Sequence, residues 1–277
     1  MPLFPVQARI TWYSTVVLPL TIVGILSIFW STAQAAEPPC KALLISGNSE
    51  YPPLLWKNPE NPDELIGVVP ALLKEILEPL GVTADIRHLG SWARVQHFAQ
   101  SGEIDMVAGA FMTRERFQYM DYILPPITHL PTAIWVPKGQ EFLYRHWPDL
   151  KGRVGSTLIG NSFGENFDRY ADEQLSIEPV RSIDQSFLMA GAGRVDYVLY
   201  ELLQGQVKLA REGLARAFVP LDKPISTEGL FFTFSKQSRC NTFDFREQVA
   251  DRLYSLVTGG RVADLVSEYT ARYIATE

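Results

Sequence analysis

The sequence has few of the residues on which several kinds of functional site depend. Its four histidines are scattered and lack the spacing of metal ligands, so we predict no metal site and no cofactor. Its 25 lysines and arginines are fewer than its 31 aspartates and glutamates, which gives a formal net charge of −6 at pH 7. Without a basic surface, binding of nucleic acid or anionic lipid is not expected.

Charge is almost absent from the first 36 residues. Arg9 is the single charged residue there, residues 12–30 form an apolar run, and residues 33–35 have the small-x-small pattern that signal peptidase recognises. We therefore expect a signal peptide over residues 1–35, cleaved after Ala35, and a periplasmic protein. An uncleaved membrane anchor is the alternative, because the apolar run is long for a signal peptide.

Cysteine is scarce too, since Cys40 and Cys240 are the only two. Cys40 follows Glu37 and two prolines rather than small apolar residues, so we expect no lipid attachment there. Export places both cysteines in an oxidising compartment, where a disulfide is expected rather than two free thiols.

The remaining chain has a globular composition, and its apolar segments alternate between strand length and helical periodicity. The first half is expected to contain strands at 42–46, 82–88 and 104–108, and helices at 69–80 and 92–99. This β-α-β-α-β order predicts a parallel sheet with helices on both faces.

The same order restarts in the second half of the chain. Strands are expected at 153–159, 177–180 and 195–200, helices at 163–175 and 186–190, and two helices within 243–274. Apolar strands at 132–136 and 230–235 join the two α/β units. Two units joined in this way predict two lobes with a cleft between them, where ligands bind beyond the carboxyl ends of the strands.

Seven short motifs follow one another at residues 51–54, 65–68, 101–105, 113–116, 151–155, 193–196 and 260–269. In this order they resemble the family-3 extracytoplasmic solute-binding proteins, the polar amino acid receptors of bacterial ABC importers. The resemblance implies a two-lobed α/β fold of the type II periplasmic-binding-protein kind, with two parallel-type sheets and a two-strand hinge. The implied lobes are residues 36–133 with 229–277, and residues 134–228.

In that layout Cys40 precedes the first strand, and Cys240 follows the strand that re-enters the first lobe from the hinge. The two strands run in opposite directions, so both cysteines lie at the outer end of the lobe. We predict a structural Cys40–Cys240 disulfide far from the cleft.

Arg116 ends the threonine-x-x-arginine signature, whose arginine grips the ligand's carboxylate in the family. A guanidinium suits this role because its donors meet both carboxylate oxygens at once. The resemblance also implies that Asn161 and Ser162, in the turn after Gly160, place donors at a helix N-terminus facing the same carboxylate. The alternatives are a surface arginine and an ordinary helix cap.

Three further positions are assigned by the resemblance. Glu201 stands where the family has an aspartate that pairs with the ligand's ammonium, Tyr51 matches a stacking tyrosine, and Trp92 matches an apolar pocket residue. The alternatives are a solvent-facing glutamate at a helix start and a tryptophan that only packs in the core.

The sequence departs from the family at Gly109 and Phe111, which we also assign to the pocket. Small or hydroxyl residues usually precede the signature threonine, and Phe111 stands where a hydroxyl would help to hold the carboxylate. The acidic residue expected near residues 69–71 is absent as well. A ligand more apolar or aromatic than a standard α-amino acid is therefore compatible with the site.

Residues 160–164 also read as G-x-S-x-G, the nucleophile elbow of α/β-hydrolases. That fold needs a histidine after the serine, whereas the last histidine here is His146, so we exclude an esterase.

We predict a monomeric binding protein, not an enzyme, that closes on a small carboxylate-bearing solute and delivers it to the membrane permease of an ABC importer. Two alternatives stay open. One is a periplasmic dehydratase that resembles cyclohexadienyl dehydratase, with Glu201 as the cleft carboxylic acid. The other is a sensory module that presents ligand to a separate partner.

Overall fold

The computed structural model describes residues 2, 11, 12 and 40–275 of the chain. Apart from residues 2, 11 and 12, the predicted signal peptide lies outside the described residues, and so does its predicted cleavage site at Ala35. Within the described part, no helix combines the length and apolarity needed to cross a membrane.

The first lobe is built around three parallel strands, β1 (Ala42–Ser46), β5 (Thr83–Ile86) and β6 (Met106–Phe111). Helices α1 (Val68–Leu77) and α2 (Trp92–Ser101) connect them, as the apolar periodicity predicts. All six residues of β6 are buried, because this strand lies inside the sheet between β13 and β1.

The second lobe repeats this pattern with β9 (Val154–Leu158), β10 (Ser176–Val180) and β11 (Tyr197–Glu201), which are also parallel. Its crossover helices are α3 (Glu165–Gln174) and α4 (Ile183–Gly191). The predicted helix at 163–175 therefore begins two residues later than expected. Gly164 is its N-cap, without a side-chain cap, so an N-cap at Asn161 or Ser162 is wrong.

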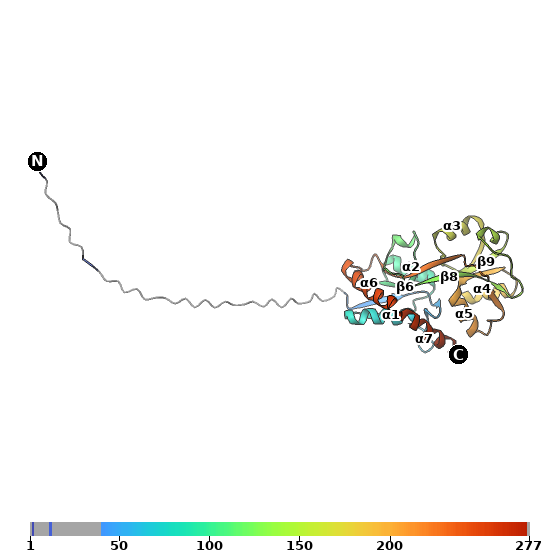
Figure 1. Ribbon diagram of the computed structural model, residues 1–277, viewed down its shortest axis with the longest axis horizontal. Helices are drawn as coiled ribbons and strands as arrows, with labels where there is room; N and C mark the ends of the chain where they lie inside the picture. Colours follow the sequence, from blue (N-terminus) through green and yellow to red (C-terminus); the bar gives the residue numbers. More distant parts are fainter. Residues whose placement is uncertain (1, 3–10, 13–39, 276–277) are drawn as a thin grey trace. The chain divides into compact units, whose positions relative to one another are not determined.

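Two long antiparallel strands join the lobes, β8 (Thr128–Pro137) and β13 (Ser226–Ser235). β8 also pairs with β11, and β13 pairs with β6, so the strand order is β10-β9-β11-β8-β13-β6-β1-β5. Figure 1 shows β8 running from the side of β6 to that of β9. The two-lobed fold is as predicted, and the two parallel sets are continuous through the hinge strands. The lobe boundaries stay a prediction.

The other elements complete the two lobes. They are α5 (Leu202–Arg211), α6 (Phe243–Thr258), α7 (Arg261–Ala275), β2 (Glu50–Tyr51), β3 (Leu55–Lys57), β4 (Leu65–Ile66), β7 (Met120–Tyr122), β12 (Phe218–Pro220), and three 3-10 turns at Glu78–Leu80, Arg116–Gln118 and Trp147–Leu150. α7 packs against α5 through a buried cluster of Trp56, Val207 and Tyr273, which links the two lobes.

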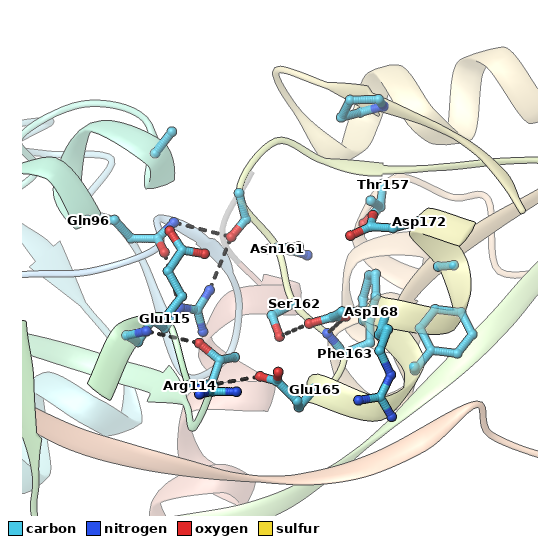
Figure 2. A pocket seen from close by; sticks show the side chains of 18 of the residues that line it. Gln96, Arg114, Glu115, Thr157, Asn161, Ser162, Phe163, Glu165, Asp168 and Asp172 are labelled. Atoms are coloured by element: carbon cyan, nitrogen blue, oxygen red, sulfur yellow. Dashed lines mark hydrogen bonds between the residues drawn. The ribbon is translucent and has the colours of Figure 1, made fainter. Parts of the chain in front are cut away.

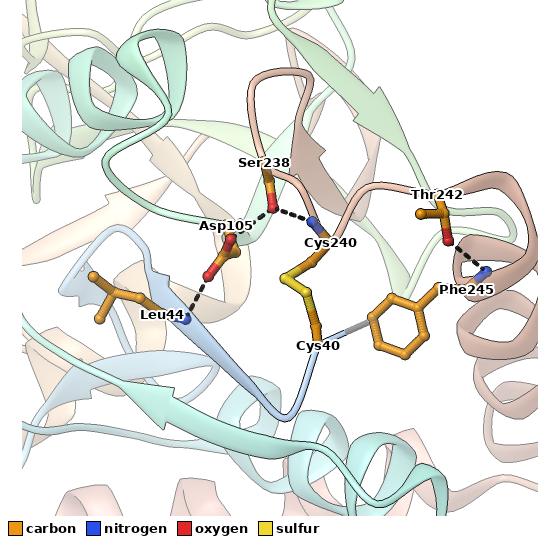
Figure 3. Close-up of a disulfide and its surroundings, with 7 residues drawn as sticks. All are labelled: Cys40, Leu44, Asp105, Ser238, Cys240, Thr242 and Phe245. Carbon is orange, nitrogen blue, oxygen red and sulfur yellow. Dashed lines mark hydrogen bonds between the residues drawn. A yellow bond between two sulfur atoms is a disulfide. The ribbon is translucent and has the colours of Figure 1, made fainter. Parts of the chain in front are cut away.

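The predicted disulfide is present between Cys40 and Cys240, whose Cα atoms are 5.5 Å apart. Asp105 holds the same corner together, because its carboxylate accepts hydrogen bonds from the Leu44 N–H at 2.9 Å and the Ser238 hydroxyl at 2.6 Å (Figure 3). Cys40 precedes β1, whereas the residues that follow the carboxyl end of β1 line the cavity described below.

Candidate functional site

A small cavity lies where β6 and β11 end, between the two lobes. All eight residues assigned to ligand binding line it: Tyr51, Trp92, Gly109, Phe111, Arg116, Asn161, Ser162 and Glu201. The cavity has a volume of about 30 Å³, which is room for about two water molecules. The structure therefore brings the predicted residues together, and their role in binding stays a prediction.

A wider groove adjoins this cavity and opens to solvent, with a volume of about 1120 Å³. One of its walls is α2 and the turn at 113–119, and the other is α3 with the turn before it (Figure 2). Arg116, Asn161 and Ser162 line both spaces. These three residues therefore lie where the groove and the cavity meet.

Arg116 is buried and its guanidinium is held by three protein oxygens. Nε donates to Gln96 Oε1 at 3.1 Å, Nη1 to the Phe111 carbonyl at 3.0 Å, and Nη2 to the Gly160 carbonyl at 3.1 Å. The guanidinium carbon also lies 5.3 Å from the centre of the Trp92 ring. These contacts fix the orientation of the cation and exclude a surface arginine.

The signature threonine positions this arginine. Thr113 Oγ1 accepts a hydrogen bond from the Arg116 backbone N–H at 3.2 Å, which closes the turn after β6. Phe111, which replaces a hydroxyl residue, contributes its backbone as well as its ring, because its carbonyl accepts from both Arg116 and the Tyr122 hydroxyl.

The carbonyl of Gly160 connects the two walls of the site. It accepts hydrogen bonds from Trp92 Nε1 at 2.9 Å, Gln96 Nε2 at 3.2 Å and Arg116 Nη2 at 3.1 Å. Trp92 also belongs to a core cluster of the first lobe, so it both packs and lines the cavity. Gln96 was not predicted, because nothing in the pattern of α2 distinguishes it from the other polar residues of that helix.

The turn before α3 was expected to face a ligand carboxylate, and part of it holds a carboxylate of the protein. Ser162 Oγ donates to Asp168 Oδ2, and the Phe163 backbone N–H donates to Asp168 Oδ1 at 2.8 Å (Figure 2). Burial raises the pKa of Asp168, while these two hydrogen bonds and the charge of Arg116 oppose the shift. Asp168 was missed because its side chain reaches back over six residues.

Glu201 ends β11 with 1% of its surface exposed, so it is not the solvent-facing glutamate of the alternative interpretation. Tyr51 and Glu201 both line the cavity, and the Glu201 Oε2 atom has no hydrogen-bond partner within the described residues. Burial raises the pKa of Glu201 to about 7, against the opposing effect of Tyr51. This buried carboxyl can therefore gain or lose a proton near neutral pH.

Gly109 is required by the shape of β6 where the strand lines the cavity. Its φ angle is +102°, and a Cβ atom placed on it would lie 3.3 Å from the Leu230 side chain. The partner strand β13 has a register shift between Phe231 and Phe232 at this level. A larger residue would therefore have to displace a wall of the cavity.

Among the described residues, no group of three or more histidines, cysteines, aspartates or glutamates is placed to hold a metal ion. The polar groups that converge on the cavity are one cation, one buried carboxyl, amides and hydroxyls. Such a set can hold a small charged solute by hydrogen bonds.

Solved structures with the same fold cover most of the chain. An amino acid ABC transporter substrate-binding protein, AbpA from Streptococcus pneumoniae bound to L-arginine, has 19% identity and a TM-score of 0.72, covering 85% of this chain and 97% of its own. A mutant of ArgBP from T. maritima has 20% identity and a TM-score of 0.69, covering 83% and 96%. A histidine kinase sensor domain has 19% identity and a TM-score of 0.68, covering 83% and 96%.

At these identities the solved structures show the fold alone. No curated protein matches the sequence. The model of one protein family matches residues 43–272, which include every residue of the cavity. The chain therefore belongs to the bacterial extracellular solute-binding proteins, family 3.

Proposed function

We propose that this solute-binding protein captures a small carboxylate-bearing solute, an amino acid or a related organic acid, between its lobes for an ABC importer. The observation that carries the proposal is that Arg116 and Glu201, both buried, line one cavity from opposite lobes. A buried cation and a buried carboxyl in one site complement a solute with a carboxylate and an ammonium group. Structural neighbours bound to arginine support this class of solute.

Arg116 is the proposed anchor of the carboxylate. A guanidinium has five N–H donors, and Gln96, Phe111 and Gly160 use one on each nitrogen. The buried position strengthens a further charge-assisted hydrogen bond, because little water competes for the donors.

Binding requires the lobes to separate first. A solute of amino-acid size does not fit a cavity of about 30 Å³, so its entry breaks the hydrogen bonds of the Gly160 carbonyl with Trp92 and Arg116. Closure then restores these contacts or replaces them with contacts to the solute, which is a hinge motion about β8 and β13. The closed form is the proposed partner of the permease, with the protein exported and monomeric.

The test is isothermal titration calorimetry of the parent against L-arginine, L-glutamine, L-glutamate and succinate. Arg116→Ala is expected to weaken any hit by about 10- to 150-fold, because a hydrogen bond to a charged group contributes about 1.5–3 kcal/mol. Arg114→Ala is the matched control, since this neighbouring arginine is exposed and lines only the outer groove.

Two results would contradict the proposal. One is that no carboxylate-bearing compound binds the parent, and the other is that Arg116→Ala binds every hit as tightly as the parent does. Circular dichroism of the unliganded variants shows whether they keep the fold.

Glu201 favours a second candidate, the dehydratase. A buried carboxyl with a pKa of about 7 is suited to proton transfer at neutral pH. The purified protein is incubated with prephenate and arogenate, and aromatic product is followed by absorbance, with Glu201→Gln as the inactive control. Absence of product from both substrates removes this candidate and leaves binding as the function.

A further inference from the structure

The turn before α3 is engaged by a carboxylate of the protein itself. Asp168 receives one hydrogen bond on each oxygen, from the Ser162 hydroxyl and from the Phe163 N–H at 2.8 Å. A hydroxyl and a backbone N–H beside a helix N-terminus are also the donors with which such a turn would bind a solute's carboxylate. Asp168 therefore satisfies donors that an incoming anion would need.

Asp168 also lies within the electrostatic reach of the proposed anchor. The positive charge of Arg116 lowers the pKa of Asp168, in opposition to burial, so the two charges interact across the site. Asp168 lines the outer groove, and its partner Ser162 lines both the groove and the cavity (Figure 2). The carboxylate is therefore placed where the two spaces meet.

We propose that Asp168 is a specificity-determining residue. Its carboxylate competes with the carboxylate of the solute for the turn before α3 and for Arg116. The proposal rests on the proposed function. A carboxylate-bearing solute has to displace Asp168 from the turn or bind beside an uncompensated negative charge. A solute without a carboxylate neither displaces Asp168 nor adds a second negative charge beside it. Asp168 therefore weakens the binding of anionic groups selectively.

A purely structural Asp168 would behave differently. If its two hydrogen bonds only hold the turn in shape, removing its charge would loosen the turn and weaken all solutes alike. If it is a competitor, removing its charge strengthens the binding of carboxylates and leaves matched carboxylate-free compounds unchanged. The comparison of paired ligands separates the two roles.

The experiment measures dissociation constants of the full chain by calorimetry for three matched pairs: L-arginine and agmatine, L-lysine and cadaverine, L-glutamine and 4-aminobutanamide. The second member of each pair lacks only the carboxylate. Asp168→Asn keeps an oxygen for the Phe163 N–H, and Asp168→Ala is the second variant in case the first does not fold. Asp172→Asn is the control, because Asp172 is an exposed acidic residue of α3 in the same groove.

We expect Asp168→Asn to lower the dissociation constant of at least one carboxylate-bearing member by fivefold or more, or to bind one that the parent does not bind. The dissociation constant of the matched compound without a carboxylate should change by less than twofold. Asp172→Asn should change neither value by more than twofold. Equal changes within each pair, weaker binding of the carboxylate members, or no binding of any of them to either Asp168 variant overturns the proposal.

Arg116→Ala in the Asp168→Asn background separates this proposal from the proposed function. Tight carboxylate binding that survives loss of Arg116 means that Arg116 is not the anchor, while the effect of Asp168 stands. Carboxylate binding that depends on Arg116 but is unchanged in Asp168→Asn means that only the competition is wrong.

Discussion

The hydroxyl of Tyr200 donates a hydrogen bond to the backbone carbonyl of Glu50 in the other lobe. The residues beside them interact as well, because burial and the neighbouring Glu201 carboxylate raise the pKa of the Tyr51 hydroxyl. The rings of Tyr51 and Tyr200 pack edge to face with centres 6.4 Å apart. Two dipeptides therefore link the lobes at the cavity: Glu50–Tyr51, which is the whole of β2, and the last two residues of β11.

Replacing Tyr200 by phenylalanine removes one of these links. The free energy of unfolding is expected to fall by about 1–2 kcal/mol, because the partly buried carbonyl of Glu50 loses this hydrogen bond. Tyr197→Phe is the control, since Tyr197 is equally buried and its hydroxyl has no hydrogen-bond partner within the described chain. Urea denaturation of both variants should show a loss for Tyr200→Phe only; equal stabilities would contradict the role of the link.

Glu201 makes the stability of the protein depend on pH. Its pKa rises from 4.5 to about 7 on burial, so between these values the folded protein binds more protons than the unfolded chain. The free energy of unfolding should therefore fall as pH rises through this window, by on the order of 3 kcal/mol from this group alone. The contribution stops changing only when Glu201 is fully ionised in the folded protein, about one pH unit above its folded pKa.

Glu201→Gln isolates this contribution. The amide does not titrate, so the variant should lose less stability than the parent between pH 5 and pH 8, while all other carboxyls titrate in both proteins. Urea denaturation at the two pH values measures the difference. A parent and a variant with the same loss would show that Glu201 has an ordinary pKa.

Gly109 is expected to tolerate no side chain. Alanine there combines a positive φ angle with contact against Leu230, whereas Gly81 has a positive φ angle of 71° and no atom within 4 Å of an added Cβ. Strain of this kind costs about 1–3 kcal/mol. Thermal denaturation should show Gly109→Ala as clearly less stable than Gly81→Ala, and equal losses would mean that backbone conformation alone matters.

The disulfide should stabilise the fold without affecting binding. Replacing both Cys40 and Cys240 by serine is expected to lower the free energy of unfolding by about 2–4 kcal/mol. Affinity for a solute should not change, because Cys40 lies at the opposite end of β1 from Asn48, which lines the cavity. Dithiothreitol should lower the stability of the parent in the same way and leave the double variant unchanged.

Much of this arrangement was predictable from the sequence. Apolar periodicity predicted the parallel strands and the crossover helices of both lobes. The eight residues predicted for the pocket all line one cavity. Helix α5 and the small sheet of β2, β3 and β4 were missed, because short apolar segments carry no clear period.

The contacts that define the chemistry of the site were not predictable. The hydrogen bond of Asp168 to Ser162 depends on where α3 begins, and a start two residues earlier would turn the carboxylate elsewhere. The raised pKa of Glu201 results from its burial. A local sequence pattern does not predict that burial, because residues distant in the sequence cause it. Residue types and spacing predict which side chains meet, while their partners follow from the packing.

The Cys40–Cys240 bond also has a consequence for proteolysis. The bond encloses residues 41–239, which contain all of the second lobe and both hinge strands, β8 and β13. A protease that cuts one exposed loop in this range leaves two pieces joined covalently, so the nicked protein keeps its mass until a reductant is added. Clipping of a surface loop would thus be visible only on a reducing gel.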